Sequence, residues 1–141
     1  MSRTPPSPEA GPRVRRSQAG TSLIEFALVL GVFVMLVFAI IQFSRAVWDY
    51  SIVSSAARDG VRYAVVRGAE SGSVASAADI QAYVRSRAMG LTPLGITVTW
   101  TPNNRPGSIV AVQVGYDFTA AIPFYPAAFH LASRSQMEIA Q

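Results

Sequence analysis

The 141-residue sequence contains no cysteine, no lysine and only one histidine, His130. Without cysteine there is neither a disulfide framework nor a thiolate metal site, so any folded part must be held together by packing alone. A Ser-His-Asp arrangement around His130 would need a distant carboxylate such as Asp117 and an unmarked serine. Glycine-rich phosphate loops, paired carboxylates and metal-ligand clusters are also missing, so we predict neither an enzyme nor a cofactor.

What the sequence does contain is one long apolar run, from Phe26 to Phe43, in which Gln42 is the only strongly polar residue. As a helix, this run would extend about 27 Å, close to the thickness of the hydrocarbon core of a bilayer. A secretory signal has a shorter apolar region followed by a cleavage site, whereas here the helical pattern simply continues. We therefore predict a membrane-spanning helix over about residues 24–43 that stays in the mature protein.

The net charge of +4 is concentrated before this run. Residues 1–20 contribute +3 of it and include the cluster Arg13, Arg15 and Arg16, while the rest of the chain is nearly neutral. Clustered arginine beside a membrane helix favours a cytoplasmic N-terminus, with the bulk of the chain outside the cytoplasm. A nucleic-acid partner is not expected, because the remainder of the chain offers no basic face.

Glu25 stands at the start of the apolar run and has two interpretations. Together with Ser22 it matches a capping box, in which Ser22 would be the N-cap of the helix. Alternatively, a carboxylate at the edge of a membrane helix indicates a functional residue with a partner of its own. The proline-rich leader before it, residues 1–20, has almost no apolar residues and is expected to be disordered.

Gly20, five residues before Glu25 and preceded by the arginine cluster, completes a recognisable order: basic leader, glycine, four residues, glutamate, apolar helix. This order resembles the type IV prepilin signature, in which a membrane peptidase cuts after the glycine. The stretch Gly20–Leu30, then Gln42-Phe43-Ser44-Arg45 and Ala56–Ala64, is similar to the TadE-like family of pseudopilins, which belongs to the tight-adherence (Flp-type) pilus machinery of bacteria.

The resemblance implies cleavage between Gly20 and Thr21 by a prepilin peptidase, and pairing of Glu25 with the N-terminal amine of a neighbouring subunit. It implies a minor, membrane-inserted subunit that takes part in pilus assembly or priming, and hence in adhesion. Its partners would be the membrane, the peptidase, other pilin and pseudopilin subunits and the assembly platform. The alternatives are an uncleaved signal-anchored scaffold protein of a secretion or adhesion complex and, less simply, a membrane-tethered enzyme using His130.

Four further residues lie, by this resemblance, where the helix meets the head: Arg58, Asp59, Arg62 and Tyr63. The resemblance implies packing or subunit contact for them. From spacing alone, the three charged ones indicate a solvated helix face with an i,i+3 ion pair.

The rest of the chain predicts an α+β fold. Helical spacing predicts one long helix from about Ser22 to Val66, with Gly68 as its C-cap. Ser76-x-x-Asp79 predicts the start of a short second helix. The predicted organisation is a leader at 1–20, a long helix at 21–67 and an extracytoplasmic head at 68–141.

Alternating residues predict the sheet of this head. Segments 96–101 and 110–118 form an antiparallel hairpin, in which Val98 and Trp100 face the same core as Val112 and Val114. Segment 131–140 supplies a third, edge strand. Residues 120–129, apolar with two prolines, are either a connection tucked against the sheet or an exposed patch for a neighbouring subunit.

Overall fold

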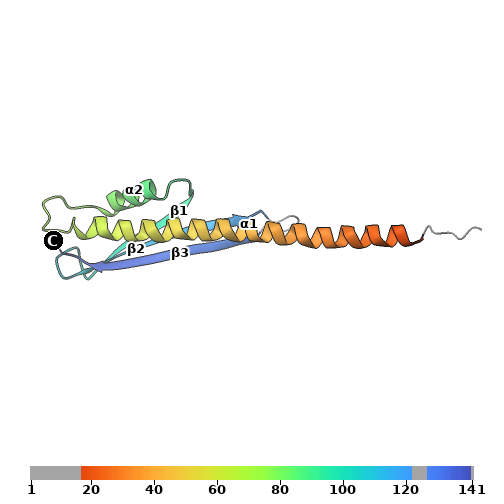
Figure 1. Ribbon diagram of the computed structural model, residues 1–141. Coiled ribbons are helices and arrows are strands. Elements are labelled where there is room, and N and C mark those ends of the chain that lie inside the picture. Colours follow the sequence, from red (N-terminus) through yellow and green to blue (C-terminus); the bar gives the residue numbers. More distant parts are fainter. Residues whose placement is uncertain (1–16, 122–126, 141) are drawn as a thin grey trace, which may run out of the picture. The chain divides into compact units, whose positions relative to one another are not determined.

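The computed structural model describes residues 17–121 and 127–140, which form two helices and a three-stranded antiparallel sheet (Figure 1). The elements, in order, are α1 (Ser17–Val65), α2 (Ala77–Arg87), β1 (Leu94–Thr101), β2 (Ile109–Ala120) and β3 (Ala127–Glu138). The predicted α+β class, with a long helix, a short helix and a small antiparallel sheet, is confirmed. Contacts divide the chain into two compact units, Met1–Val37 and Phe38–Gln141.

At its N-terminus, α1 is longer than the sequence predicted. It begins at Ser17 rather than near Ser22, so the last residues of the expected disordered leader are helical. The sequence has no proline between Pro12 and the end of α1, and glutamine and alanine at positions 18 and 19 are good helix formers, which explains the extension. The predicted arginine cluster of the leader lies outside the described residues.

The predicted C-cap at Gly68 is wrong. α1 ends at Val65, and the Arg67 N–H donates a hydrogen bond of 3.1 Å to the Ala64 carbonyl oxygen, closing the helix with a tighter turn. Gly68 is buried and is not among the glycines with positive φ, which are Gly72, Gly90 and Gly107. The tight turn satisfies an end carbonyl of the helix without a left-handed residue.

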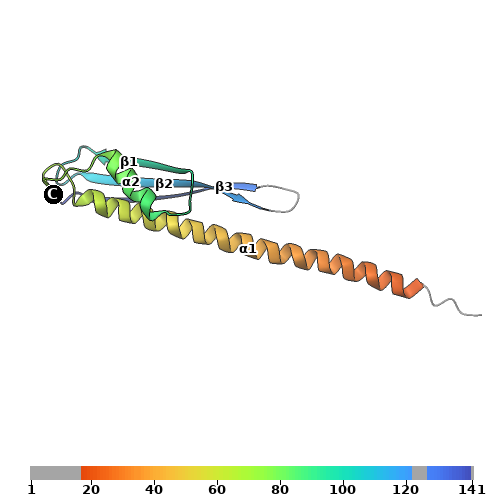
Figure 2. The same ribbon diagram turned by 90° about the horizontal axis from the view of Figure 1, so that it is seen from above.

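The outer half of α1 supplies the core of the second unit. Its buried face, which includes Val53, Ala57 and Val61, repeats every three to four residues as one stripe of a helix does. This stripe packs with Ile80 and Val84 of α2 and with one face of the sheet, so both helices cover that face (Figures 1 and 2). The central strand β2 contributes its alternate side chains Val110, Val112 and Val114.

The start of α2 is a complete capping box, as the sequence predicted. The Asp79 N–H donates to the Ser76 hydroxyl oxygen at 3.2 Å, and the Ser76 N–H donates to the Asp79 carboxylate at 2.9 Å. Hydrogen bonds from the Ser76 hydroxyl and then from its backbone N–H lower the pKa of Asp79. The ionised carboxylate therefore stabilises this helix end above the ordinary pKa of aspartate, and that stabilisation is lost as the pH falls through the lowered pKa.

Strand order is β1-β2-β3, with both pairs antiparallel. Val98 pairs with Val112 and Trp100 with Val110, so the predicted shared core face is confirmed. The connection between β1 and β2 contains a type II turn, because Gly107 has φ of 81° and the Ser108 N–H bonds the Arg105 carbonyl oxygen at 3.1 Å.

β3 is the predicted third strand and lies at an edge of the sheet, but it begins at Ala127, four residues earlier than expected. The predicted connection over 120–129 is therefore shorter than the sequence indicated. Its last residues, 127–129, are strand, and residues 122–126 lie outside the described part of the chain. The strand starts directly after Pro126, so neither proline of the segment falls within it. Both prolines thus precede the hydrogen-bonded part of the edge strand.

Gly60 lies where α1 approaches both α2 and β2 closely. A Cβ atom at this position would lie 2.5 Å from Val84 Cγ2 and 3.3 Å from Val112 Cγ1. Both are buried core atoms, so a methyl group could be accommodated only by moving α2 or the sheet.

We expect Gly60→Ala to destabilise the second unit by about 1–3 kcal/mol through overpacking, although alanine is the better helix former. Urea unfolding of the full chain in detergent micelles, followed by near-ultraviolet circular dichroism, measures this change. Gly31→Ala is the matched control in the same helix, since a Cβ there meets no atom within 4 Å. Unchanged stability of Gly60→Ala would contradict the packing, and adding Val84→Ala should remove part of the penalty.

Candidate functional site

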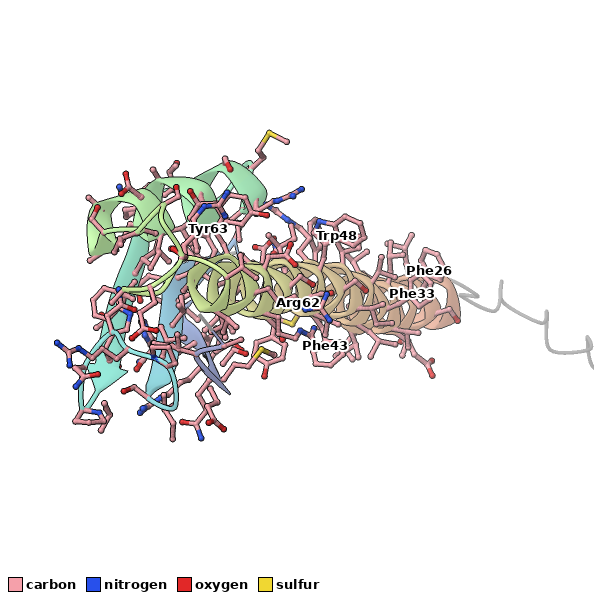
Figure 3. All side chains as sticks on the ribbon, turned by 90° about the vertical axis from the view of Figure 1, so that its left-hand side faces the viewer. Phe26, Phe33, Phe43, Trp48, Arg62 and Tyr63 are labelled. Atoms are coloured by element: carbon pink, nitrogen blue, oxygen red, sulfur yellow. The ribbon has the colours of Figure 1, made fainter. Side chains whose placement is uncertain are left out.

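The first feature of functional interest is the apolar surface of α1. Every residue from Gly20 to Ile41 is exposed in the structure, and Phe26 and Phe33 project outward from the helix (Figure 3). The exposed fraction of Phe26 is 66%. Among the described residues, α1 is the one helix long and apolar enough to cross a membrane. A continuous apolar surface of this length is compatible with a single-pass membrane anchor.

The predicted cleavage and assembly residues lie at the start of this surface. Gly20, Thr21 and Glu25 are all exposed and all helical, so the Gly20–Thr21 bond lies within the first turns of α1. Ser22 is the sixth residue of the helix, which makes the capping-box interpretation of Ser22 and Glu25 wrong for the full chain. Glu25 is thus a carboxylate on the side of a helix, about 6 Å along the axis from Thr21.

The four residues predicted at the junction of helix and head separate into different environments. Arg58 and Arg62 are exposed, whereas Asp59 and Tyr63 are partly buried. Figure 3 shows Tyr63 on the side of α1 that faces α2 and Arg62 on another side. The expected ion pair within Arg58, Asp59 and Arg62 does not form in the described part of the chain, where the one pair within salt-bridge distance joins Asp117 to His130.

Tyr63 belongs to a stack that the sequence did not predict. Its ring lies 4.3 Å from the ring of Tyr83 of α2, centroid to centroid, with 18° between the planes. The Arg67 guanidinium lies 4.0 Å from the Tyr63 ring, and the Arg87 guanidinium lies 5.2 Å from the Tyr83 ring. The stacked rings therefore tie α2 to α1, and each ring also has an arginine within cation–π distance.

Arg87 also donates hydrogen bonds to the Tyr83 hydroxyl, 3.2 Å from Nε and 3.0 Å from Nη2. These bonds are the main reason why the pKa of Arg87 is raised. A sequence signal exists for one of these contacts, because Tyr83-x-x-x-Arg87 has the i,i+4 spacing that brings side chains together on a helix. Tyr63 and Arg67 have the same spacing, but Arg67 lies in the turn after α1. The contact of one such pair with the other required the tertiary structure.

His130 has an acidic partner after all. Its Nδ1 lies 2.6 Å from Oδ1 of Asp117, which faces it across the β2–β3 pair, and both side chains are exposed. The imidazole lies over Gly115, where a Cβ would be 3.1 Å from the ring. No hydroxyl group bonds its Nε2 within the described residues, so this pair has the geometry of a surface contact between strands. Nor do the described residues bring together three or more groups able to hold a metal ion.

Comparison with known proteins gives one match. The model of a family described as TadE-like protein matches residues 20–62, which is less than a third of the chain. A search of curated proteins and a search of solved structures found no match. The matched region begins at Gly20, contains Glu25 and the whole exposed apolar surface of α1, and ends at Arg62. TadE-like proteins are components of the Tad pilus rather than enzymes. The resemblance of this chain to the TadE-like family is thus confirmed over residues 20–62.

Proposed function

We propose that the chain is a minor pilin-like subunit, a pseudopilin, of a tight-adherence type IV pilus, and that it acts by assembly and not by catalysis. The observation that carries this proposal is the coincidence of the TadE-like match with the exposed apolar surface of α1. A helix that leaves such a surface uncovered requires lipid or the helices of other subunits around it. A pilin-like subunit meets both, first in the membrane and then in the filament.

The proposed topology places the N-terminus in the cytoplasm and the head on the other side of the membrane. Arg13, Arg15 and Arg16 precede the apolar run, whereas Arg45 after it is followed by Asp49. This asymmetry satisfies the positive-inside rule. The Gly20–Thr21 bond would then lie at the inner face of the membrane, where a prepilin peptidase can reach it. The other proposed partners are pilin and pseudopilin subunits and the assembly platform, and the destination is the extracellular pilus.

Glu25 has a role in this scheme because cleavage creates a new charge. Cutting after Gly20 leaves an α-ammonium group on Thr21 at the edge of the lipid, where an unpaired charge is costly. Glu25 is the one carboxylate between Glu9 and Asp49 in the sequence. At an effective dielectric constant near 20, opposite charges about 4 Å apart attract by roughly 4 kcal/mol before desolvation is subtracted. We propose that the Glu25 carboxylate forms an ion pair with the Thr21 α-ammonium group of a neighbouring subunit and so sets the axial register between helices.

The junction residues divide between two proposed roles. Tyr63 holds α2 to α1 through its stack, and Asp59 is partly buried beside it on the same helix. Arg58 and Arg62 are exposed and lack a carboxylate partner within salt-bridge distance in the described part of the chain. These two guanidinium groups are the proposed contacts to an acidic surface of a neighbouring subunit.

An uncleaved signal-anchored scaffold is the second candidate. One observation favours it: α1 runs without a break through the Gly20–Thr21 bond, from Ser17 onward. Peptidase access then depends on opening of the first helical turn, which is the part of a helix that frays most readily.

Maturation distinguishes the two candidates. In membranes that contain an active prepilin peptidase, we expect the mature protein to begin at Thr21, as measured by mass spectrometry of the N-terminus. Gly20→Arg should leave the full chain uncut because the residue before the scissile bond is then large and charged. A control change at Gly31, to alanine, lies in the same helix and should not alter cleavage. Full-length wild-type protein under these conditions would identify the scaffold.

Replacing Glu25 tests the assembly role. We expect Glu25→Gln to be inserted and cleaved normally but to co-purify poorly with the other pilus subunits, because glutamine cannot neutralise the Thr21 amine. A net loss of even 1.4 kcal/mol would lower association about tenfold. Glu70→Gln is the matched control, since Glu70 is an exposed carboxylate in the loop after α1. Wild-type levels of Glu25→Gln in the assembly would show that Glu25 is not the partner of the amine.

A further inference from the structure

Gln42, the polar residue of the apolar run, is turned toward the sheet. Its Nε2 donates a hydrogen bond of 2.9 Å to the carbonyl oxygen of Ala121, directly after β2. Gln42 is partly buried, while its neighbours Ile41 and Phe43 are exposed. Its Oε1 is buried and has no hydrogen-bond partner in the described part of the chain. This contact fixes the β2–β3 end of the sheet at the level of the last turn of the apolar run.

The depth of this contact follows from the proposed membrane insertion. If the run from Phe26 to Phe43 fills the hydrocarbon core, Gln42 lies at its outer boundary. Phe43 and Trp48 are 71% and 70% exposed and project from α1, as aromatic residues of a membrane interface do (Figure 3). Trp48 lies about 9 Å beyond Gln42 along the helix, which is within the headgroup layer.

The β2–β3 end of the sheet has the composition of a membrane contact. From Phe118 to Phe129 the sequence contains no charged residue, and Asp117 and His130, which flank it, pair with each other across the strands. Phe129 pairs with Phe118 and is 56% exposed. Phe118 lies three residues, or about 10 Å of strand, before Ala121, and Phe129 lies opposite Phe118 on β3. Phe129 and Trp48 are therefore at similar distances from the Gln42–Ala121 hydrogen bond, measured along the strand and along the helix. β2 and β3 run alongside α1 within this unit (Figures 1 and 2).

We propose that this end of the sheet, defined by residues 118–121 and 127–129 and here named the sheet foot, rests in the headgroup layer of the outer leaflet. It is a second membrane contact beside α1, and its partner is lipid. The inference rests on the proposed insertion of α1, because the Gln42–Ala121 hydrogen bond holds the sheet foot at the membrane depth of Gln42. The exposed Asp117–His130 pair is where the strands leave the lipid. Extraction of the subunit into a filament must detach the sheet foot.

Absence of cysteine allows a direct test on the full chain. The Phe129→Cys variant is labelled with an environment-sensitive fluorophore and reconstituted into vesicles of phosphatidylethanolamine and phosphatidylglycerol. The vesicles also contain some phosphatidylcholine that bears a nitroxide quencher near its headgroup. Met137→Cys is the matched control, because Met137 lies on the same strand and face, is 44% exposed, and is about 27 Å further along. We expect the lipid nitroxide to quench the label at 129 several-fold more than the label at 137. Iodide in the buffer should show the reverse order.

A third label, at Leu36→Cys in the apolar run, separates the inference from the proposal it rests on. Deep lipid nitroxides should quench this label, and failure to do so would overturn the membrane insertion itself. With Leu36 quenched, equal iodide quenching at positions 129 and 137 would overturn the sheet foot while leaving the proposed function intact. Shielding of position 129 from both quenchers would also overturn it, since a neighbouring subunit and not lipid would then cover this surface.

Discussion

The structure depends on the packing of the outer half of α1 against the sheet. A sheet of three strands has too little surface to bury a core of its own, and the chain has no cysteine to reinforce it. Val53, Ala57 and Val61 of α1 fill the face of the sheet that α2 leaves open. Gly60 lets α1 approach both partners closely. The helix that carries the apolar surface is therefore also the main element of the head's core.

This double use of one helix explains how the sequence pattern of α1 changes along its length. The first half is apolar on all sides and exposed, which suits an environment that is apolar on all sides. The second half has a buried stripe of small and branched residues and an outer face with exposed arginine. The TadE-like match covers both halves, from Gly20 to Arg62, and stops before the sheet. The similarity to that family thus lies on the helix.

Polar contacts place the remaining parts on this framework. The Tyr63–Tyr83 stack with its two arginines fastens α2 to α1, and the Asp117–His130 pair joins the central strand β2 to the edge strand β3. The Gln42–Ala121 hydrogen bond holds the end of the sheet to α1. Each is a partly or fully exposed interaction, so each contributes modestly to stability compared with the core. Their effect is on position, because each joins groups of two different elements of the fold.

By itself, the sequence determined the features that depend on near neighbours in the chain. The capping box of α2, the alternation of β1 and β2, the type II turn at Gly107 and the length of the apolar run are all local, because helix caps, strand pleat and turns are fixed by residues at most a few positions apart. Only the tertiary structure decided the start of β3, the end of α1 at Val65 and the partners of Gln42, Tyr63 and His130. Gln42 and Ala121 are 79 residues apart, and no local pattern specifies which distant group a side chain will meet. Such contacts are set by how the elements pack, since the buried stripe of α1 fixes where every other element, and so every other polar group, must lie.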